Sequence, residues 1–160
     1  MSIKVGDKLP NGTLYEMGTD GPQPIAVADM TRGKRVVFFG LPGAFTPTCS
    51  ALHVPGYVAQ ADKMKAKGVD EIACISVNDA FVMGAWGKDQ KVGTKVRMLG
   101  DGSGLWTKAM GLEFDLVDKG LGQRCQRFSM LVEDGVVKSL DIEAPGKFEV
   151  SDAQSLLNRL

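Results

Sequence analysis

The pattern Thr-Pro-Thr-Cys at residues 46–49 stands inside the stretch PGAFTPTCSALHVPG, directly after the apolar run VVFFG. Thr46 is a good N-cap residue, and Pro47 suits the first position of a helix. Cys49 is then the third helical residue, where unpaired N–H groups and the positive end of the helix dipole favour a thiolate over a thiol. Because the thiolate is the nucleophilic form of cysteine, the pattern predicts sulfur chemistry at Cys49.

Thr46 has a possible second role beside the sulfur. Its oxygen can accept a hydrogen bond from the Cys49 N–H while its O–H donates elsewhere, and a donor beside a thiolate suits an oxygen-bearing substrate. The alternative is purely structural: buried cysteines are common, and the Thr-Pro pair would then only start a helix. Spacing alone leaves both interpretations open.

The composition is that of one globular domain, which we expect to span residues 1–160. Nineteen basic residues balance nineteen acidic ones, so no basic surplus points to nucleic acid or to an anionic membrane surface. No apolar run approaches the ~20 residues of a membrane span. The N-terminal segment MSIKVGDKLPNG is too polar for a signal peptide, which predicts a cytoplasmic protein.

The chain has three cysteines, Cys49, Cys74 and Cys125, and no CxxC pair. An odd number of cysteines without a signal peptide indicates reduced thiols in a cytosol. His53 is the only histidine, so a metal site lacks ligands and no metal is expected.

Strands and helices alternate along the first two thirds of the chain. Buried strands are predicted over 35–40, 72–77 and 96–99, with a short strand at 25–27. A helix is predicted over 47–67 with a kink at its Pro-Gly pair, and later helices are predicted to be capped by Asn78 and Ser103.

The last third of the chain predicts a hairpin and a final helix. Asp134-Gly135 is a two-residue turn between two β-like runs, and Ser151 with Gln154 forms a capping box. Strands alternating with helices, then a hairpin and a helix, predict a three-layer α/β domain with a mixed central sheet.

Pro42, Thr46 and Cys49 match the Pro-x-x-x-Thr-x-x-Cys motif of peroxiredoxins. The wider text LPGAFTPTCSALHVPGYV, together with ISVNDAFVMGAW and RFSM further along, resembles the type II peroxiredoxins of the peroxiredoxin five subfamily. The resemblance runs from about Lys8 to the C-terminus. It implies a thioredoxin-like fold, in agreement with the predicted layers.

The resemblance also implies the site residues. Cys49 resembles the peroxidatic cysteine, Arg127 the arginine that holds thiolate and peroxide, Thr46 the hydroxyl that binds the peroxide oxygens, and Pro42 the residue that shields the site. The implied reaction is attack of the Cys49 thiolate on the O–O bond of hydrogen peroxide or an organic hydroperoxide, which leaves a sulfenic acid. Arg127 and Thr46 can supply donors to the leaving oxygen. No cofactor is implied.

Some type II peroxiredoxins carry a resolving cysteine near the C-terminus, but the segment APGKFEVSDAQSLLNRL has none. An external thiol, from glutathione with glutaredoxin or from thioredoxin, is therefore expected to resolve Cys49 unless another thiol reaches it. Cys74 is predicted to be a buried core thiol. Cys125 lies two residues before Arg127, so we expect both on one strand face, with Cys125 just beyond bonding distance.

The resemblance further implies a homodimer through the face around the site, with Phe45, Phe81 and Trp86 as exposed candidates; the alternative is that all three are ordinary core. Two other functions remain open. One is a redox sensor or holdase that uses oxidised Cys49 to change partners. The other is a hydrolase with a Cys49–His53 nucleophile pair, since the two residues are four apart on a helix.

Overall fold

Apolar runs form the centre of the sheet. β3 (Arg35–Gly40) and β4 (Glu71–Ser76) are buried at every residue but their first, as expected of strands covered on both faces. β4 pairs in parallel with β3 on one side and with β5 (Arg97–Gly100) on the other. The three predicted buried strands are therefore confirmed, each to within one residue of its expected bounds.

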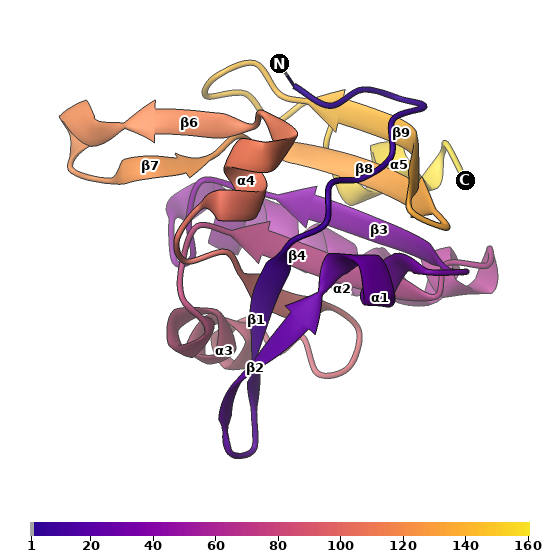
Figure 1. Ribbon diagram of the computed structural model, residues 1–160, viewed down its shortest axis with the longest axis horizontal. Helices are drawn as coiled ribbons and strands as arrows, with labels where there is room; N and C mark the ends of the chain where they lie inside the picture. The colour runs from indigo at the N-terminus through magenta and orange to yellow at the C-terminus, as the bar shows by residue number, and fades with distance from the viewer. Residues whose placement is uncertain (1) are drawn as a thin grey trace.

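The structure, a computed structural model, describes residues 2–160. Its main sheet has seven strands in the order β2-β1-β5-β4-β3-β8-β9 (Figure 1). β1 pairs with β5, and β8 pairs with β3, both antiparallel, so the sheet is mixed as predicted. The strands not yet bounded are β1 (Thr13–Gly18), β2 (Gly21–Ala26), β8 (Phe128–Glu133), β9 (Val136–Ile142) and, in a separate two-stranded sheet, β6 (Glu113–Leu116) and β7 (Gly122–Cys125).

Helices cover both faces of the sheet, which gives the three predicted layers. Alternate residues of β3 point to opposite faces: Val37 and Phe39 join one core, and Val36 and Phe38 join the other. The first core is closed by α2, α3 and α5, and the second by α1 and α4. The helices are α1 (Val27–Thr31), the π-helix η1 (Cys49–His53), α2 (Val54–Ala66), α3 (Ala80–Asp89), α4 (Leu105–Met110), the 3₁₀-helix η2 (Val117–Lys119) and α5 (Ala153–Leu157).

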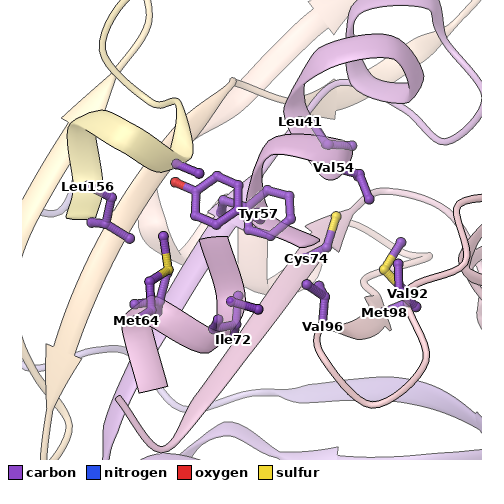
Figure 2. Close-up of a cluster of buried hydrophobic side chains, with 14 of the residues drawn as sticks. Leu41, Val54, Tyr57, Met64, Ile72, Cys74, Val92, Val96, Met98 and Leu156 are labelled. Atoms are coloured by element: carbon purple, nitrogen blue, oxygen red, sulfur yellow. The ribbon is translucent and has the colours of Figure 1, made fainter. Parts of the chain in front are cut away.

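The first core contains a cluster of large side chains. Tyr57 of α2 stacks on Phe39 of β3, with ring centroids 3.9 Å apart and an interplanar angle of 5°. Figure 2 shows Tyr57 beside Leu156 of α5, above the sulfur-bearing side chain of Cys74. This core is the surface on which the cysteine-bearing helix rests.

Five elements were not predicted, namely β1, α1, β6, η2 and β7. The short strand expected at 25–27 is the end of a longer β2, and Val27 already belongs to α1. The β1–β2 and β6–β7 hairpins were missed because their strands are largely exposed and carry no apolar run. The predicted turn at Asp134-Gly135 is confirmed: both residues have positive φ, +47° and +77°, as a two-residue hairpin turn requires.

Candidate active site

Strand pairing brings the cysteine segment and the arginine together. In the antiparallel ladder between β3 and β8, Gly40 faces Phe128. The loop that leaves β3 therefore runs beside Arg127, which immediately precedes β8. A Cβ on Gly40 would overlap the Phe128 ring, so this pairing needs glycine at position 40.

Cys49 lies in the first turns of the helix, as predicted. The helical turn starts at Pro47, and the Ser50 N–H donates to the Thr46 carbonyl at 2.9 Å. From Cys49 to His53 the helix is a π-helix, closed by the Val54 N–H donating to the Cys49 carbonyl. The expected irregularity thus falls just before Pro55, which cannot donate a backbone hydrogen bond.

The sulfur of Cys49 is buried and has a cationic partner. The side chain is 0% exposed, and Sγ accepts a hydrogen bond from Arg127 Nη2 at 3.1 Å. The guanidinium places a fixed positive charge and an N–H donor directly against this sulfur. The structure thus brings together the two residues, 78 apart in sequence, that the motif comparison singled out.

The loop before Cys49 is held by side chains from two other elements. Arg124 of β7 donates from Nη1 to the Pro42 carbonyl at 3.1 Å. Asn78 accepts from the Ala44 N–H at 3.0 Å through its Oδ1. Asn78 was predicted to cap α3, which is wrong: Asp79 is the cap and accepts from the Val82 N–H. The amide of Asn78 serves the active-site loop instead.

The hydroxyl of Thr46 is oriented by this loop. Its O–H donates to the Gly43 carbonyl at 2.7 Å, and the expected side-chain cap of the Cys49 N–H does not occur among the described residues. The proton of the hydroxyl is thus committed to Gly43, and its lone pairs are left to accept hydrogen bonds. Thr46 is half-buried and lines a cavity together with Pro42 and Arg127.

His53 contacts Arg127 as a neutral ring, a role that the sequence reasoning missed. Its Nδ1 lies 2.8 Å from Arg127 Nη1, and its Nε2 lies 3.1 Å from the Ser151 carbonyl. Burial, and then the charge of Arg127, lower the pKa of His53 from 6.5 to about 3. Both ring nitrogens are occupied by groups other than Cys49, which removes the geometry required for the Cys49–His53 hydrolase.

A cavity of about 420 Å³ opens beside the arginine. Its walls come from the loop before Cys49, from β6 and the turn that follows it, from the two residues before β8 and from the loop after β9. The lining residues are Pro42, Thr46, Thr48, Phe114, Leu116, Lys119, Leu121, Gln126, Arg127 and residues 143–148. A cavity of this size can hold a small organic molecule.

Of the other two cysteines, Cys74 lies where it was expected and Cys125 does not. Cys125 ends β7, whereas β8 begins at Phe128, so the expectation that Cys125 and Arg127 share one strand face is wrong. Cys125 belongs to the second core, and burial raises the pKa of its thiol to about 12. Cys74 is buried in the first core with Cys49, as predicted, and burial raises its pKa well above the ordinary value.

Two features are absent from the described residues, 2–160. Within this range no group of three or more His, Cys, Asp or Glu side chains is arranged to hold a metal ion. No helix in the same range has the length and apolar character to cross a bilayer.

Comparison with known proteins places this fold and site in a family. The Redoxin family model matches residues 4–157. Peroxiredoxin-2B of Arabidopsis thaliana is 49% identical over 159 residues, which cover 99% of this chain and 98% of the relative. The structure of reduced Prx3 from Vibrio vulnificus in complex with H₂O₂ is 50% identical, covers 98% of each chain and has a TM-score of 0.94. Peroxiredoxin 5 from Alvinella pompejana is 37% identical over 98% of this chain and 96% of its own, with a TM-score of 0.85.

A thioredoxin-like fold that holds a cysteine at a helix start against an arginine defines a class of thiol oxidoreductases. The chain belongs to the redoxin family. Relatives that are about 50% identical to it in sequence are type II peroxiredoxins. It is accordingly a thiol-dependent peroxidase, an antioxidant enzyme that reduces peroxides.

Proposed function

We propose that Cys49 is the peroxidatic residue and that Arg127 activates it. The observation that carries this assignment is the 3.1 Å hydrogen bond from Arg127 Nη2 to Cys49 Sγ, next to a cavity lined by the same arginine. The thiolate attacks one peroxide oxygen, the O–O bond breaks, and Cys49 becomes a sulfenic acid. The other oxygen leaves with the bonding electron pair and takes up a proton to become water or an alcohol.

Arg127 and Thr46 assist at the two peroxide oxygens. The guanidinium stabilises the charge that develops on the leaving oxygen, because its N–H donors form a fixed fork. The Thr46 hydroxyl donates its own proton to the Gly43 carbonyl, so its oxygen is free to accept a hydrogen bond from the O–H of the peroxide. This hydrogen bond orients the peroxide. Pro42 covers the approach to the sulfur, and its carbonyl is held by Arg124.

An external thiol completes the cycle. The sulfenic acid of Cys49 condenses with glutathione to a mixed disulfide and water, and glutaredoxin with a second glutathione releases the thiol; thioredoxin is the alternative reductant. The burial of Cys74 and Cys125 supports this assignment, since the pKa of each is raised and neither is a thiolate near neutral pH.

Steady-state peroxide consumption with each reductant tests this function. The parent enzyme should turn over hydrogen peroxide and cumene hydroperoxide with at least one of the two systems, and Cys49→Ser should be inactive. Activity of Cys49→Ser within about tenfold of the parent would contradict the assignment of the nucleophile. Sustained turnover also separates an enzyme from a redox sensor, which reacts once and changes partners.

The chain is proposed to work as a homodimer in the cytoplasm. Phe45 and Phe81 are 54% and 63% exposed, and the left-handed backbone of Phe45 (φ +63°) turns its ring outward. Trp86, the third expected interface residue, is instead core: it is 0% exposed and donates to Ser50 Oγ. Cytoplasmic location is supported by three free cysteines and is checked by fractionation of the producing cell.

A further inference from the structure

Glu143 is a buried carboxylate with an unusual number of donors. It lies just after β9 (Val136–Ile142) and is 6% exposed. Its oxygens accept from the backbone N–H groups of Glu149, Val150 and Ser151 at 2.8–3.0 Å, and from Ser151 Oγ at 2.8 Å. Burial works against its charge, but these hydrogen bonds outweigh burial, so the pKa of Glu143 lies below its ordinary value. The carboxylate therefore closes residues 143–151 into a tight loop.

The loop closed by Glu143 carries two of the groups that hold Arg127 and His53. The Ser151 carbonyl accepts from His53 Nε2 at 3.1 Å and from the Tyr57 hydroxyl at 2.8 Å. The centroid of the Phe148 ring lies 5.0 Å from the centroid of the His53 ring. The same centroid lies 5.7 Å from Arg127 Cζ.

Glu143 also touches the arginine through the backbone. Its N–H donates to the Arg127 carbonyl at 2.9 Å, so Glu143 is joined to the segment that precedes β8 as well as to the loop after β9. Glu143 thus joins two segments, the one before β8 through its backbone N–H and the loop after β9 through its carboxylate.

We propose that Glu143 is a positioning residue of the peroxidase reaction: it fixes the Ser151 carbonyl and the Phe148 ring, and through them the His53–Arg127 pair that faces Cys49 Sγ. The carboxylate oxygens of Glu143 accept from residues 149–151 and are not bonded to Cys49 Sγ. The carbonyl of Ser151 makes Nε2 the protonated nitrogen of His53, which leaves Nδ1 free to accept from Arg127 Nη1. The second arm of the guanidinium is thereby directed at the sulfur.

The role requires an ionised carboxylate. Oε2 of Glu143 accepts from Glu149, Val150 and Ser151, whereas Oε1 accepts only from the Glu149 N–H. A glutamine of the same size has one neutral oxygen for the Oε2 position, and its NH₂ group would then face the Glu149 N–H, where neither group can accept. Glu143→Gln should therefore loosen the loop without opening a cavity. Because the aim of a donor matters most where charge develops in the transition state, the reaction with peroxide should suffer more than the simple reactivity of the sulfur.

The test compares two second-order rate constants of Cys49 in the same protein. One is oxidation by hydrogen peroxide, which needs donors at the leaving oxygen; the other is alkylation by iodoacetamide, which needs only the thiolate. In Glu143→Gln we expect the ratio of peroxide rate to alkylation rate to fall about tenfold or more. The matched control is Glu149→Gln, which removes the same charge from the same loop but from an exposed side chain; its ratio should equal that of the parent.

The inference rests on the peroxidase function, and different experimental outcomes would contradict the function and the inference. If the parent does not react with peroxide, the function is wrong. If the parent reacts and Glu143→Gln retains the parent ratio, or both rates fall in parallel, Glu143 is only a structural residue and the inference is overturned. Should Glu143→Gln not fold, Glu143→Asp, which keeps the charge on a shorter side chain, is judged by the same ratio.

Discussion

The Nδ1 atom of His53 accepts a hydrogen bond from the Arg127 guanidinium across 2.8 Å. The direction follows from the other ring nitrogen: a carbonyl can only accept, so Nε2 carries the proton toward Ser151. One arm of the guanidinium is thus held by His53 while the other donates to Cys49 Sγ at 3.1 Å. The arginine acts here as a fork with both arms occupied, which a point charge could not reproduce.

Replacement of Arg127 by lysine tests the fork directly. Lysine keeps the charge but carries its donors on a single nitrogen, so it lacks the two separate arms with which Arg127 contacts His53 and Cys49. We expect Arg127→Lys to lose about 10²-fold or more in kcat/KM for hydrogen peroxide. Nearly full activity in Arg127→Lys would mean that charge alone matters.

Replacement of His53 by phenylalanine should change how stability depends on pH. The ring lies among Phe39, Tyr57 and Phe148, so phenylalanine suits the site. His53 titrates at about 3 when folded and near 6.5 when unfolded, so the unfolded chain binds the extra proton between these values. Its contribution to stability is complete above about pH 6.5 and declines by about 1.4 kcal/mol for each pH unit below it.

Urea unfolding of both proteins at about pH 7 and about pH 5 measures this difference. The parent should lose about 2 kcal/mol more than His53→Phe between the two conditions. Identical losses would show that His53 is not held neutral. The same variant should react about tenfold more slowly with peroxide, because Arg127 loses an acceptor.

Removal of both other thiols should leave turnover intact. Alanine is the suitable replacement for Cys74 and Cys125, since each sulfur lies in an apolar core where a hydroxyl would be costly. The Cys74→Ala, Cys125→Ala variant should keep most of its activity with glutathione and glutaredoxin. Mass spectrometry of the oxidised protein should find glutathione on Cys49. A Cys49–Cys74 disulfide in the parent, with turnover lost in the variant, would instead assign resolution to Cys74.

A charge on α3 should dissociate the proposed dimer. Phe81 is 63% exposed, so Phe81→Asp should fold normally and sediment as a monomer. Val5→Asp is the control, since Val5 is 58% exposed near the N-terminus, away from α3 (Figure 1), and should not alter the sedimentation of the parent. A parent that sediments as a monomer at micromolar concentration would refute the dimer.

A methyl group at Gly40 should disturb the site by displacing Phe128, the residue next to Arg127. The added Cβ overlaps the Phe128 ring, next to Arg127, so Gly40→Ala should lose about 1–3 kcal/mol of stability and most of its activity. Gly56→Ala is the matched control inside α2, where the Cβ meets Ala153 at an ordinary 3.7 Å. There the same change should stabilise the protein by about 0.5–1 kcal/mol. Calorimetry and peroxide consumption measure both.

Much of this architecture is readable from local patterns. The buried strands, the helix start at Pro47 and the Asp134-Gly135 turn depend on neighbouring residues alone, and all were predicted. Exposed hairpins such as β6–β7 lack an apolar pattern, so nothing local marks them. Motif comparison found Cys49 and Arg127, and the structure adds the distance between them.

The residues around Arg127 were beyond local reasoning, because their partners lie far away in sequence. Asn78 and Ser151 are both good cap residues by type, yet Asp79 and Asp152 make the caps. Asn78 is used by the loop before Cys49, and Ser151 by His53 and Glu143. Only the fold decides which of two adjacent polar residues serves a helix and which serves the site.

The pairing of Gly40 with Phe128 has a consequence for the newly made chain. Cys49 and Arg127 are 78 residues apart, and they meet only when β8 docks on β3. Long-range strand pairing is a slow event in folding because a large loop must close first. An incomplete or unfolded chain therefore carries Cys49 without its cation, as an ordinary thiol. Rapid reaction with peroxide should therefore return in refolding together with the β3–β8 ladder, and not before it.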